Sequence, residues 1–387
     1  MSFQLNEKIL ADVAGMHEEL LDLIKELCGV TAPSNHEEKR AAFCKAWFDK
    51  NGVPGAAIDD ADNVVLPWKT EGKNELAVIM AHTDTVFPDT EPMPLREEKG
   101  RLYSPGVGDD TANLALLMLI ARYVVKNNFT PDYGILFVCN SGEEGLGNLR
   151  GSRKICETYG KQMKYFISFD GTYEGCYNYS VGSARYKVTI KTEGGHSFSN
   201  FGNRNAIACM SSLINALYGL KVPEGGKTTY NVGSISGGTS VNTIAQNAEM
   251  LFEYRSDVRE HLDAMMGLFE TMTSAYRQMG ITVDTEIMGL RPCMGDVDKD
   301  LQSAYERKVA DAAALYTGKA PEFHSGSTDC NIPFSIGVPS VSIGGYVGDG
   351  AHTREEWIDI ESLKKGFPLL TALVLEFFRQ SEKGLFV

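Results

Sequence analysis

Residues 78–87 read VIMAHTDTVF, an apolar run that ends in a histidine and an aspartate one residue apart. Side chains alternate across a strand, so His82 and Asp84 are expected to point the same way where the strand leaves its sheet. Open α/β sheets bind ligands at the carboxyl ends of their parallel strands. An imidazole placed there can bind a metal ion while the aspartate holds its other ring nitrogen. Taken alone, such a motif is more often part of an ordinary polar surface than of a metal site.

Short apolar runs recur along the chain, each beside a stretch with helical periodicity. They read LAVIMA, YGILFVC, KYFISF and VPSVSIG. This alternation predicts an α/β fold whose doubly wound, mostly parallel sheet has helices on both faces. The first helix is expected over residues 7–28. A second is expected to begin at Ser34, because Glu37 three residues later completes a capping box.

The pattern changes between about residues 181 and 290. There RYKVTIKT, TTYNVGSIS and AEMLFEYRS alternate apolar and polar residues, with helix candidates at 206–220 and 260–279. This is typical of an antiparallel sheet with two helices on one face. We therefore expect an inserted α+β lid domain over 181–290, and a discontinuous catalytic domain formed by residues 1–180 and 291–387.

Composition and charge exclude several classes of protein. The longest apolar run, LALLMLI, is far shorter than the roughly 20 residues that a membrane-spanning helix requires, so no membrane association is expected. The net charge of −14, with no compensating basic cluster, argues against a nucleic-acid partner. The amino terminus lacks a signal-like pattern and the eight cysteines are scattered singly, which favours a cytoplasmic location.

Four further polar clusters lie at or just beyond predicted strand ends. Asp109 and Asp110 occupy a glycine-rich turn before a helix, where adjacent carboxylates repel unless a cation neutralises them. Asp110 could instead cap that helix. The other clusters are Glu143 with Glu144 in FVCNSGEEGLG, Asp170 in YFISFDG and His352 in GDGAHTREE. Five such clusters, all at strand ends, are hard to attribute to chance.

The five motifs, in this order and spacing, resemble those of the dinuclear zinc hydrolases that include peptidase T, glutamate carboxypeptidase, succinyl-diaminopimelate desuccinylase and aminoacylase. The resemblance implies two divalent metal ions, most often Zn²⁺, with Co²⁺ or Mn²⁺ as alternatives. It also implies a cis peptide bond after Asp109 and makes Asp84 the partner of His82. The implied ligand sets are His82, Asp109 and Asp170 for one metal, and Asp109, Glu144 and His352 for the other.

The resemblance also implies roles for residues that bind no metal. Glu143 would be the general base, an assignment that the residues alone do not make because the two neighbouring glutamates could exchange roles. His196 in the lid would donate a hydrogen bond to the developing oxyanion, commonly across the interface of a homodimer formed through the lid. A partly buried loop histidine is the alternative interpretation. Asn242 and Arg255 would lie near the substrate, the guanidinium suiting a carboxylate.

The substrate expected from this resemblance is a small peptide. An aspartate at the position of Asp170 accompanies aminopeptidases and dipeptidases in these enzymes more often than carboxypeptidases and deacylases. We therefore expect a peptidase T-like aminopeptidase, a tripeptidase or dipeptidase. The alternatives are an N-acyl amino acid deacylase or carboxypeptidase with the same metal pair, and a non-catalytic metal-binding relative. Thr111 and Ser197 depart from residues that many relatives carry, which blurs the subfamily.

Overall fold

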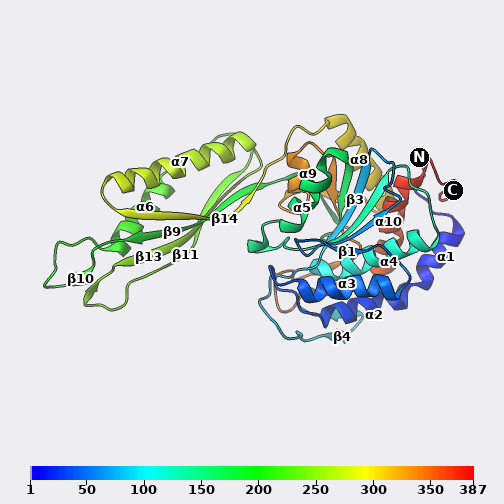
Figure 1. The fold of residues 1–387 in the computed structure, drawn as a ribbon, viewed down its shortest axis with the longest axis horizontal. Helices are drawn as coiled ribbons and strands as arrows, with labels where there is room; N and C mark the ends of the chain where they lie inside the picture. Colours follow the sequence, from blue (N-terminus) through cyan, green and yellow to red (C-terminus); the bar gives the residue numbers. More distant parts are fainter. Residues whose placement is uncertain (1) are drawn as a thin grey trace. The chain divides into compact units, whose positions relative to one another are not determined.

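The computed structural model describes residues 2–387, which divide into two compact units (Figure 1). The first unit consists of the chain up to Ser180 together with Gly295–Val387, and the second of Val181–Met294. The second unit thus ends four residues later than position 290, where the sequence pattern places the boundary. The reason is local, because β14 continues to Arg291 and Cys293 packs in the core of the second unit.

The first unit is built on an eight-stranded mixed sheet with the order β1-β2-β6-β3-β7-β16-β8-β15. Its centre, β6-β3-β7-β16, is parallel, while β2 and β8 join that centre antiparallel. The strands are β1 (Ala57–Ile58), β2 (Val64–Trp68), β3 (Leu76–His82), β6 (Gly134–Asn140), β7 (Met163–Ser168), β8 (Gly175–Ser180), β15 (Glu322–Gly326) and β16 (Ser340–Ser342). The mixed α/β fold predicted from the sequence is confirmed.

Every residue of β3 and of β6 is buried, as expected for central strands covered on both faces. Alternate residues, such as Ile79 and Phe137, belong to a large core that also includes most of α4. The helices of this unit are α1 (Glu7–Gly15), α2 (His17–Cys28), α3 (Glu38–Lys50), α4 (Asn113–Lys126), α5 (Arg150–Tyr159), α8 (Lys299–Thr317), α9 (Asn331–Ser335) and α10 (Leu363–Leu375). Among residues 2–387, no helix combines the length and apolar character needed to cross a membrane.

Smaller elements complete the first unit near the ends of its central strands. A four-stranded antiparallel sheet has the order β17-β18-β5-β4. Its strands are β4 (Arg96–Glu98), β5 (Arg101–Tyr103), β17 (Gly348–Asp349) and β18 (Trp357–Asp359). Short helical turns are η1 (Val107–Ala112), η2 (Gly145–Gly147), η3 (Gly160–Gln162) and η4 (Glu376–Phe378). In register, His82 of β3 pairs with Asn140 of β6, so these two strands end at the same edge.

The second unit has its own sheet and core. Its four-stranded antiparallel sheet has the order β11-β13-β9-β14. The separate two-stranded sheet β10-β12 lies at one end of this unit (Figure 1). The elements are β9 (Gly182–Lys191), β10 (Gly195–His196), α6 (Ala206–Tyr218), β11 (Thr228–Gly237), β12 (Thr243–Ile244), β13 (Asn247–Ser256), α7 (Arg259–Gln278) and β14 (Thr282–Arg291). Alternate residues of β9 pack with both helices in one apolar cluster.

Two local predictions are wrong. The helix expected over residues 7–28 is interrupted at Met16, where α1 ends and α2 begins. Ser34 caps no helix, because its hydroxyl donates to Asp84 Oδ2 at 2.8 Å and α3 begins only at Glu38. The side chain of Glu37 is buried and accepts from the backbone N–H of Asn35 and of Gly142. Both side chains of the apparent capping box thus face the edge of the sheet.

A stability prediction follows from the close approach of α10 to the loop after β16. A Cβ added at Gly366 would lie 1.6 Å from the backbone oxygen of Gly345, whereas one added at Gly15 would meet no atom within 4 Å. Gly366→Ala should lower the free energy of unfolding of the first unit by about 1–3 kcal/mol, the usual cost of overpacking. Gly15→Ala should leave its urea midpoint unchanged or slightly higher. Equal midpoints for the two variants would contradict the packing described.

Candidate metal centre

Five separate stretches of the first unit bring histidines and carboxylates to the carboxyl edge of the central strands. His82 ends β3, and Glu143 and Glu144 follow β6. The remaining members are Asp109 in η1, Asp170 two residues after β7 and His352 after β17. Their ligand atoms form three groups, within each of which all atoms lie within 4.8 Å of one another. The groups are His82 with Asp109 and Asp170, Asp109 with Glu144 and His352, and His82 with Glu143 and Glu144.

Asp109 is the residue that joins the first two groups. Its Oδ1 lies 3.0 Å from His82 Nε2, and its Oδ2 lies 3.1 Å from His352 Nε2. His352 Nε2 is also 3.0 Å from Glu144 Oε1. The two oxygens of one carboxylate thus face two different histidines, which is the arrangement that a bridging ligand requires. The two groups that share Asp109 coincide with the two ligand sets expected from the sequence, whereas the group of His82, Glu143 and Glu144 was not expected. The role of all these residues as ligands stays a prediction.

Asp84 fixes both the first histidine and the turn that carries the two glutamates. Its side chain is fully buried, and His82 Nδ1 lies 3.5 Å from Asp84 Oδ1 and 3.1 Å from its backbone oxygen. The same carboxylate accepts the backbone N–H of Glu143 at 3.0 Å and that of Glu144 at 2.9 Å. Asp84 therefore orients His82 with its Nε2 toward Asp109, as partners of metal-binding histidines do.

The loop that carries Asp109 is held by a residue that the sequence analysis did not single out. The buried carboxylate of Glu356 accepts the backbone N–H groups of Gly106, Gly108 and Asp109 at 2.7–2.9 Å. The peptide bond after Asp109 is cis, as the resemblance implies. Glu356 is the second of two adjacent glutamates and lies four residues after His352. Its closeness to the histidine motif is the one feature of the sequence that could have pointed to this role.

Asp110 caps no helix through its side chain. Its Oδ2 accepts the backbone N–H of His82 at 2.9 Å, and its Oδ1 accepts from Asn113 Nδ2 at 2.8 Å. Asn113 in turn accepts the backbone N–H of Gly345 and donates to the oxygen of Gly171. Asp110 and Asn113 thus tie the end of β3 to the loops that follow β7 and β16. Neither residue carries a sequence signal for this role.

The concentration of acidic groups perturbs their pKa values. Burial, followed by the charge of Asp109, raises the pKa of Glu144 to about 8 and that of Asp170 to about 7. Hydrogen bonds with Asp109 and Glu144 raise the pKa of His352 to about 11. Burial alone would lower the pKa of His82, but the charge of Asp110 and the hydrogen bonds with Asp109 and Asp84 raise it well above its usual value. Without cations, the site therefore retains protons at neutral pH.

The three remaining predicted site residues belong to the second unit. His196 Nδ1 accepts the backbone N–H of Phe198 at 3.2 Å and that of Ser199 at 3.4 Å. In the neutral imidazole the proton then sits on Nε2, which makes the exposed ring a hydrogen-bond donor. Asn242 Oδ1 accepts from the hydroxyl of Ser240 at 2.6 Å.

Arg255 is paired with an acid on its own strand. Its Nε lies 3.1 Å from Glu253 Oε1 and its terminal nitrogen 3.2 Å from Oε2. Arg185 on β9 shares the same carboxylate at 3.3 Å. A substrate carboxylate reaching Arg255 would therefore have to share the guanidinium with Glu253.

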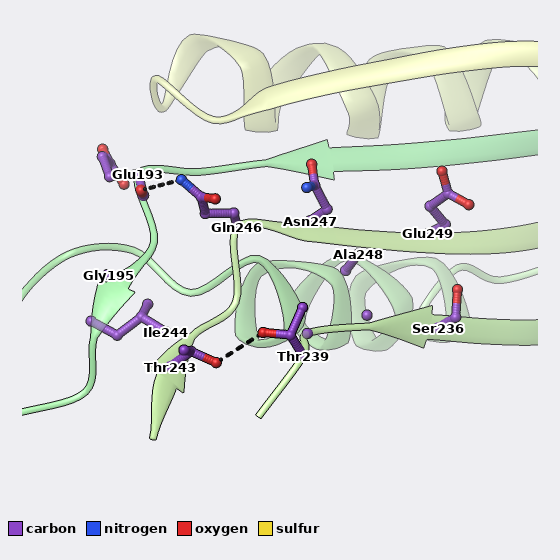
Figure 2. Close-up of a pocket in the computed structure, with 12 residues that line it drawn as sticks. Glu193, Gly195, Ser236, Thr239, Thr243, Ile244, Gln246, Asn247, Ala248 and Glu249 are labelled. Carbon is purple, nitrogen blue, oxygen red and sulfur yellow. Dashed lines mark hydrogen bonds between the residues drawn. The ribbon is translucent and has the colours of Figure 1, made fainter. Parts of the chain in front are cut away.

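The second unit also contains a hollow of about 610 Å³ beside the β10-β12 pair, shown in Figure 2. Gln246 Nε2 donates to the oxygen of Glu193 at 3.0 Å, and the hydroxyls of Thr239 and Thr243 lie 3.2 Å apart. The lining contains neither histidine nor cysteine, and its two acids are already paired, Glu193 with Arg204 and Glu249 with Lys187. The hollow therefore lacks the donors of a second metal site.

The fold and the set of nitrogen and oxygen donors are those of a metal-dependent hydrolase. Residues 78–376 match the model of Peptidase family M20/M25/M40. The chain belongs to this family and is accordingly a metal-dependent hydrolase.

Individual relatives are similar over nearly the whole chain. Carboxypeptidase G2 of Pseudomonas sp. (strain RS-16) is 24% identical, over 90% of this chain and 84% of that protein. The aminopeptidase PepT of Bacillus cereus ATCC 10987 superposes with a TM-score of 0.70 at 23% identity, covering 93% and 98% of the two chains. A tripeptidase of Staphylococcus aureus subsp. aureus Mu50 gives 0.72 at 22% identity, covering 94% and 99%. At these identities the structural likeness shows the fold alone.

The role of Glu356 can be tested beside that of its neighbour. Glu356→Ala leaves three backbone N–H groups without their acceptor and loosens the loop of Asp109, so metal affinity should fall about 10–100-fold. Glu355→Ala removes only an exposed ion pair with Arg96 and should bind metal as the wild type does. Zinc titration against a competing chelator measures both. Unchanged affinity in Glu356→Ala would contradict the support ascribed to this carboxylate.

The raised pKa values predict that metal binding expels protons. The pKa of about 11 for His352 and of about 8 for Glu144 keep both groups mostly protonated in the metal-free site at neutral pH, and the raised pKa of His82 favours its protonated form as well. Ligands bind metal in their deprotonated forms, so affinity should be weaker at pH about 6 than at pH about 8. Calorimetric zinc titrations in buffers with different ionisation enthalpies should show proton release. Heats that are independent of the buffer would show that these groups bind no metal.

Proposed function

We propose that this protein hydrolyses an amide bond of small peptides with two zinc ions, as a peptidase T-like aminopeptidase acting on tripeptides or dipeptides. The observation that carries the proposal is the shared carboxylate of Asp109, whose two oxygens face His82 and His352. Each histidine has a further carboxylate in its group, Asp170 in one case and Glu144 in the other. Two donor sets joined by one aspartate provide places for two cations.

The donors fit zinc. Imidazole nitrogens and carboxylate oxygens in groups of three leave coordination positions open, as in catalytic rather than structural zinc sites. His82, Asp109 and Asp170 would hold one ion, and Asp109, Glu144 and His352 the other. When bound, the pair would supply a water of lowered pKa and polarise the scissile carbonyl.

The chain itself supplies the proton transfers. Glu143 belongs to neither of the two ligand sets, and its backbone N–H is held by Asp84. We assign it the role of general base, which takes a proton from the attacking water and returns it to the leaving nitrogen. His196 would donate from Nε2 to the developing oxyanion, because its Nδ1 is occupied by two backbone N–H groups.

The preference for an aminopeptidase rests on Asp170 and on likeness to solved enzymes. The similar structures include one described as an aminopeptidase and one described as a tripeptidase. Similarity to carboxypeptidase G2 supports the main alternative, a carboxypeptidase or N-acyl amino acid deacylase with the same metal pair. The two alternatives differ in which end of the substrate must be free, so substrates blocked at one end distinguish them.

A hydrolysis panel tests the proposal. Purified protein loaded with zinc should cleave tripeptides or dipeptides with a free amino group, lose activity with a chelator and regain it with zinc. Peptides blocked at the amino end and N-acyl amino acids should react slowly. If only blocked substrates react, the enzyme is a carboxypeptidase or deacylase. Absence of turnover by the zinc-loaded protein would favour a non-catalytic metal-binding relative.

The roles of the two neighbouring glutamates can be separated in the same assay. Glu143→Ala should keep its metal content and lose about 10²–10⁴-fold in kcat, the usual contribution of a general base. Glu144→Ala is the matched control and should lose one metal, because it removes a ligand. Metal analysis with single-turnover rates measures both outcomes. The reverse pattern would exchange the assignments of Glu143 and Glu144.

A further inference from the structure

Asp329 and Asn140 form a buried polar pair behind the turn that carries Glu143. Asn140 is the last residue of β6, and Asp329 lies just before α9. Both side chains are fully buried, and Asn140 Nδ2 donates to Asp329 Oδ2 at 2.7 Å. The ligand sets include neither residue, so the contact requires a separate explanation.

The second oxygen of each side chain has no partner. Within residues 2–387, Asp329 Oδ1 and Asn140 Oδ1 are both buried and neither makes a hydrogen bond. Each atom is an acceptor, and a buried acceptor without a donor destabilises the folded protein. An ionised carboxylate would add an unpaired buried charge, a still larger cost. One proton on the pair removes both deficits, because a carboxylic acid and an amide can exchange two hydrogen bonds.

We propose that Asp329 is a positioning residue that carries a proton on Oδ1 and donates it to Asn140 Oδ1. The amide already donates to Oδ2 of the acid, so the two side chains are joined by a pair of hydrogen bonds. This arrangement fixes the carboxyl end of β6 and, three residues later, Glu143. The consequence for turnover rests on the role of Glu143 proposed above, whereas the proton itself does not.

The surroundings connect this pair to the catalytic edge. The backbone oxygen of Asn140 accepts both the N–H of Thr83 at 2.7 Å and its hydroxyl at 2.8 Å, directly after His82. Ser152 of α5 donates its hydroxyl to the backbone oxygen of Asp329 at 2.8 Å. Asp329 thus links α5 to the end of β6, which is itself bonded to the residue that follows the first histidine.

Electrostatics favour the neutral acid in the metal-free protein. Burial raises the pKa of Asp329 well above its usual value, and the charges of Glu143 and Asp170 act in the same direction. His82 and the hydrogen bond from Asn140 act in the opposite direction. Bound cations would favour the ionised form, so the test must include the metal-loaded protein.

Two substitutions separate a neutral donor from an ionised carboxylate. Asp329→Asn keeps one donor and one acceptor at the same place, so it should hold Asn140 as the acid does and retain kcat within about threefold. Asp329→Leu removes both and should lower kcat about 10–100-fold with KM and metal content little changed, as loss of a supporting partner does. Asp311→Asn, on the exposed face of α8, is the control for a change of charge alone.

An infrared measurement gives a readout that needs no activity. The difference spectrum of wild type minus Asp329→Asn should contain the carbonyl stretch of a protonated carboxyl group, in metal-free and in zinc-loaded protein. The proposal is overturned if that difference shows only the bands of an ionised carboxylate, or if Asp329→Asn loses as much kcat as Asp329→Leu. Full activity of Asp329→Leu would remove the positioning role.

The fold of each variant is checked separately. If Asp329→Leu fails to fold, Asn140→Leu provides the same loss from the other side of the pair. A wild type that hydrolyses no peptide would refute the proposed function but leave the infrared result to decide the proton on Asp329.

Discussion

Repulsion between carboxylates crowded at the edge of a buried sheet is the constraint on which the rest of the first unit depends. Asp109 lies in one group with Asp170 and in another with Glu144, and His82 and His352 supply compensating positive charge there. Burial weakens solvent screening, so such a set is costly unless cations or protons neutralise it. In the metal-free protein the raised pKa values of Glu144 and Asp170 reflect this cost. Two divalent ions would remove it and perform the chemistry.

The surrounding structure is organised to hold those groups against their repulsion. The carboxylate of Asp84 accepts hydrogen bonds from two backbone N–H groups beyond β6. The carboxylate of Glu356 accepts hydrogen bonds from three backbone N–H groups in the loop around Asp109. Each anchor converts a flexible loop into a fixed extension of a strand. The candidate ligands that lie in loops are consequently held as firmly as His82 at the end of β3, which is how preorganised sites keep their geometry. The buried pair of Asp329 and Asn140 supports the end of β6 in a similar way.

The sequence predicted which residues gather at the site better than it predicted which residues hold them in place. His82, Glu144 and Asp170 could be placed because each follows a short apolar run, and parallel strands end at one edge. Glu356 and Asp329 could not, because a carboxylate that binds backbone N–H groups or an amide leaves no spacing signature.

The apparent capping box at Ser34 shows how a local rule can mislead. Its two side chains satisfy the capping pattern, yet Ser34 bonds Asp84 and Glu37 accepts from Gly142, both contacts that arise only after the strands assemble. The break at Met16 is similar, since helical periodicity continues across it. At Ser34 tertiary contacts overrode the local capping preference. At Met16 the periodicity of the apolar residues continues although the helix itself is interrupted.

The bridging role of Asp109 is the central claim, and anomalous diffraction from zinc-loaded crystals tests it most directly. Data collected on the two sides of the zinc absorption edge should give two peaks in the first unit. One peak should contact His82 and Asp170, the other Glu144 and His352, and both should contact the carboxylate of Asp109. A single peak, or two peaks that do not share Asp109, would contradict the account.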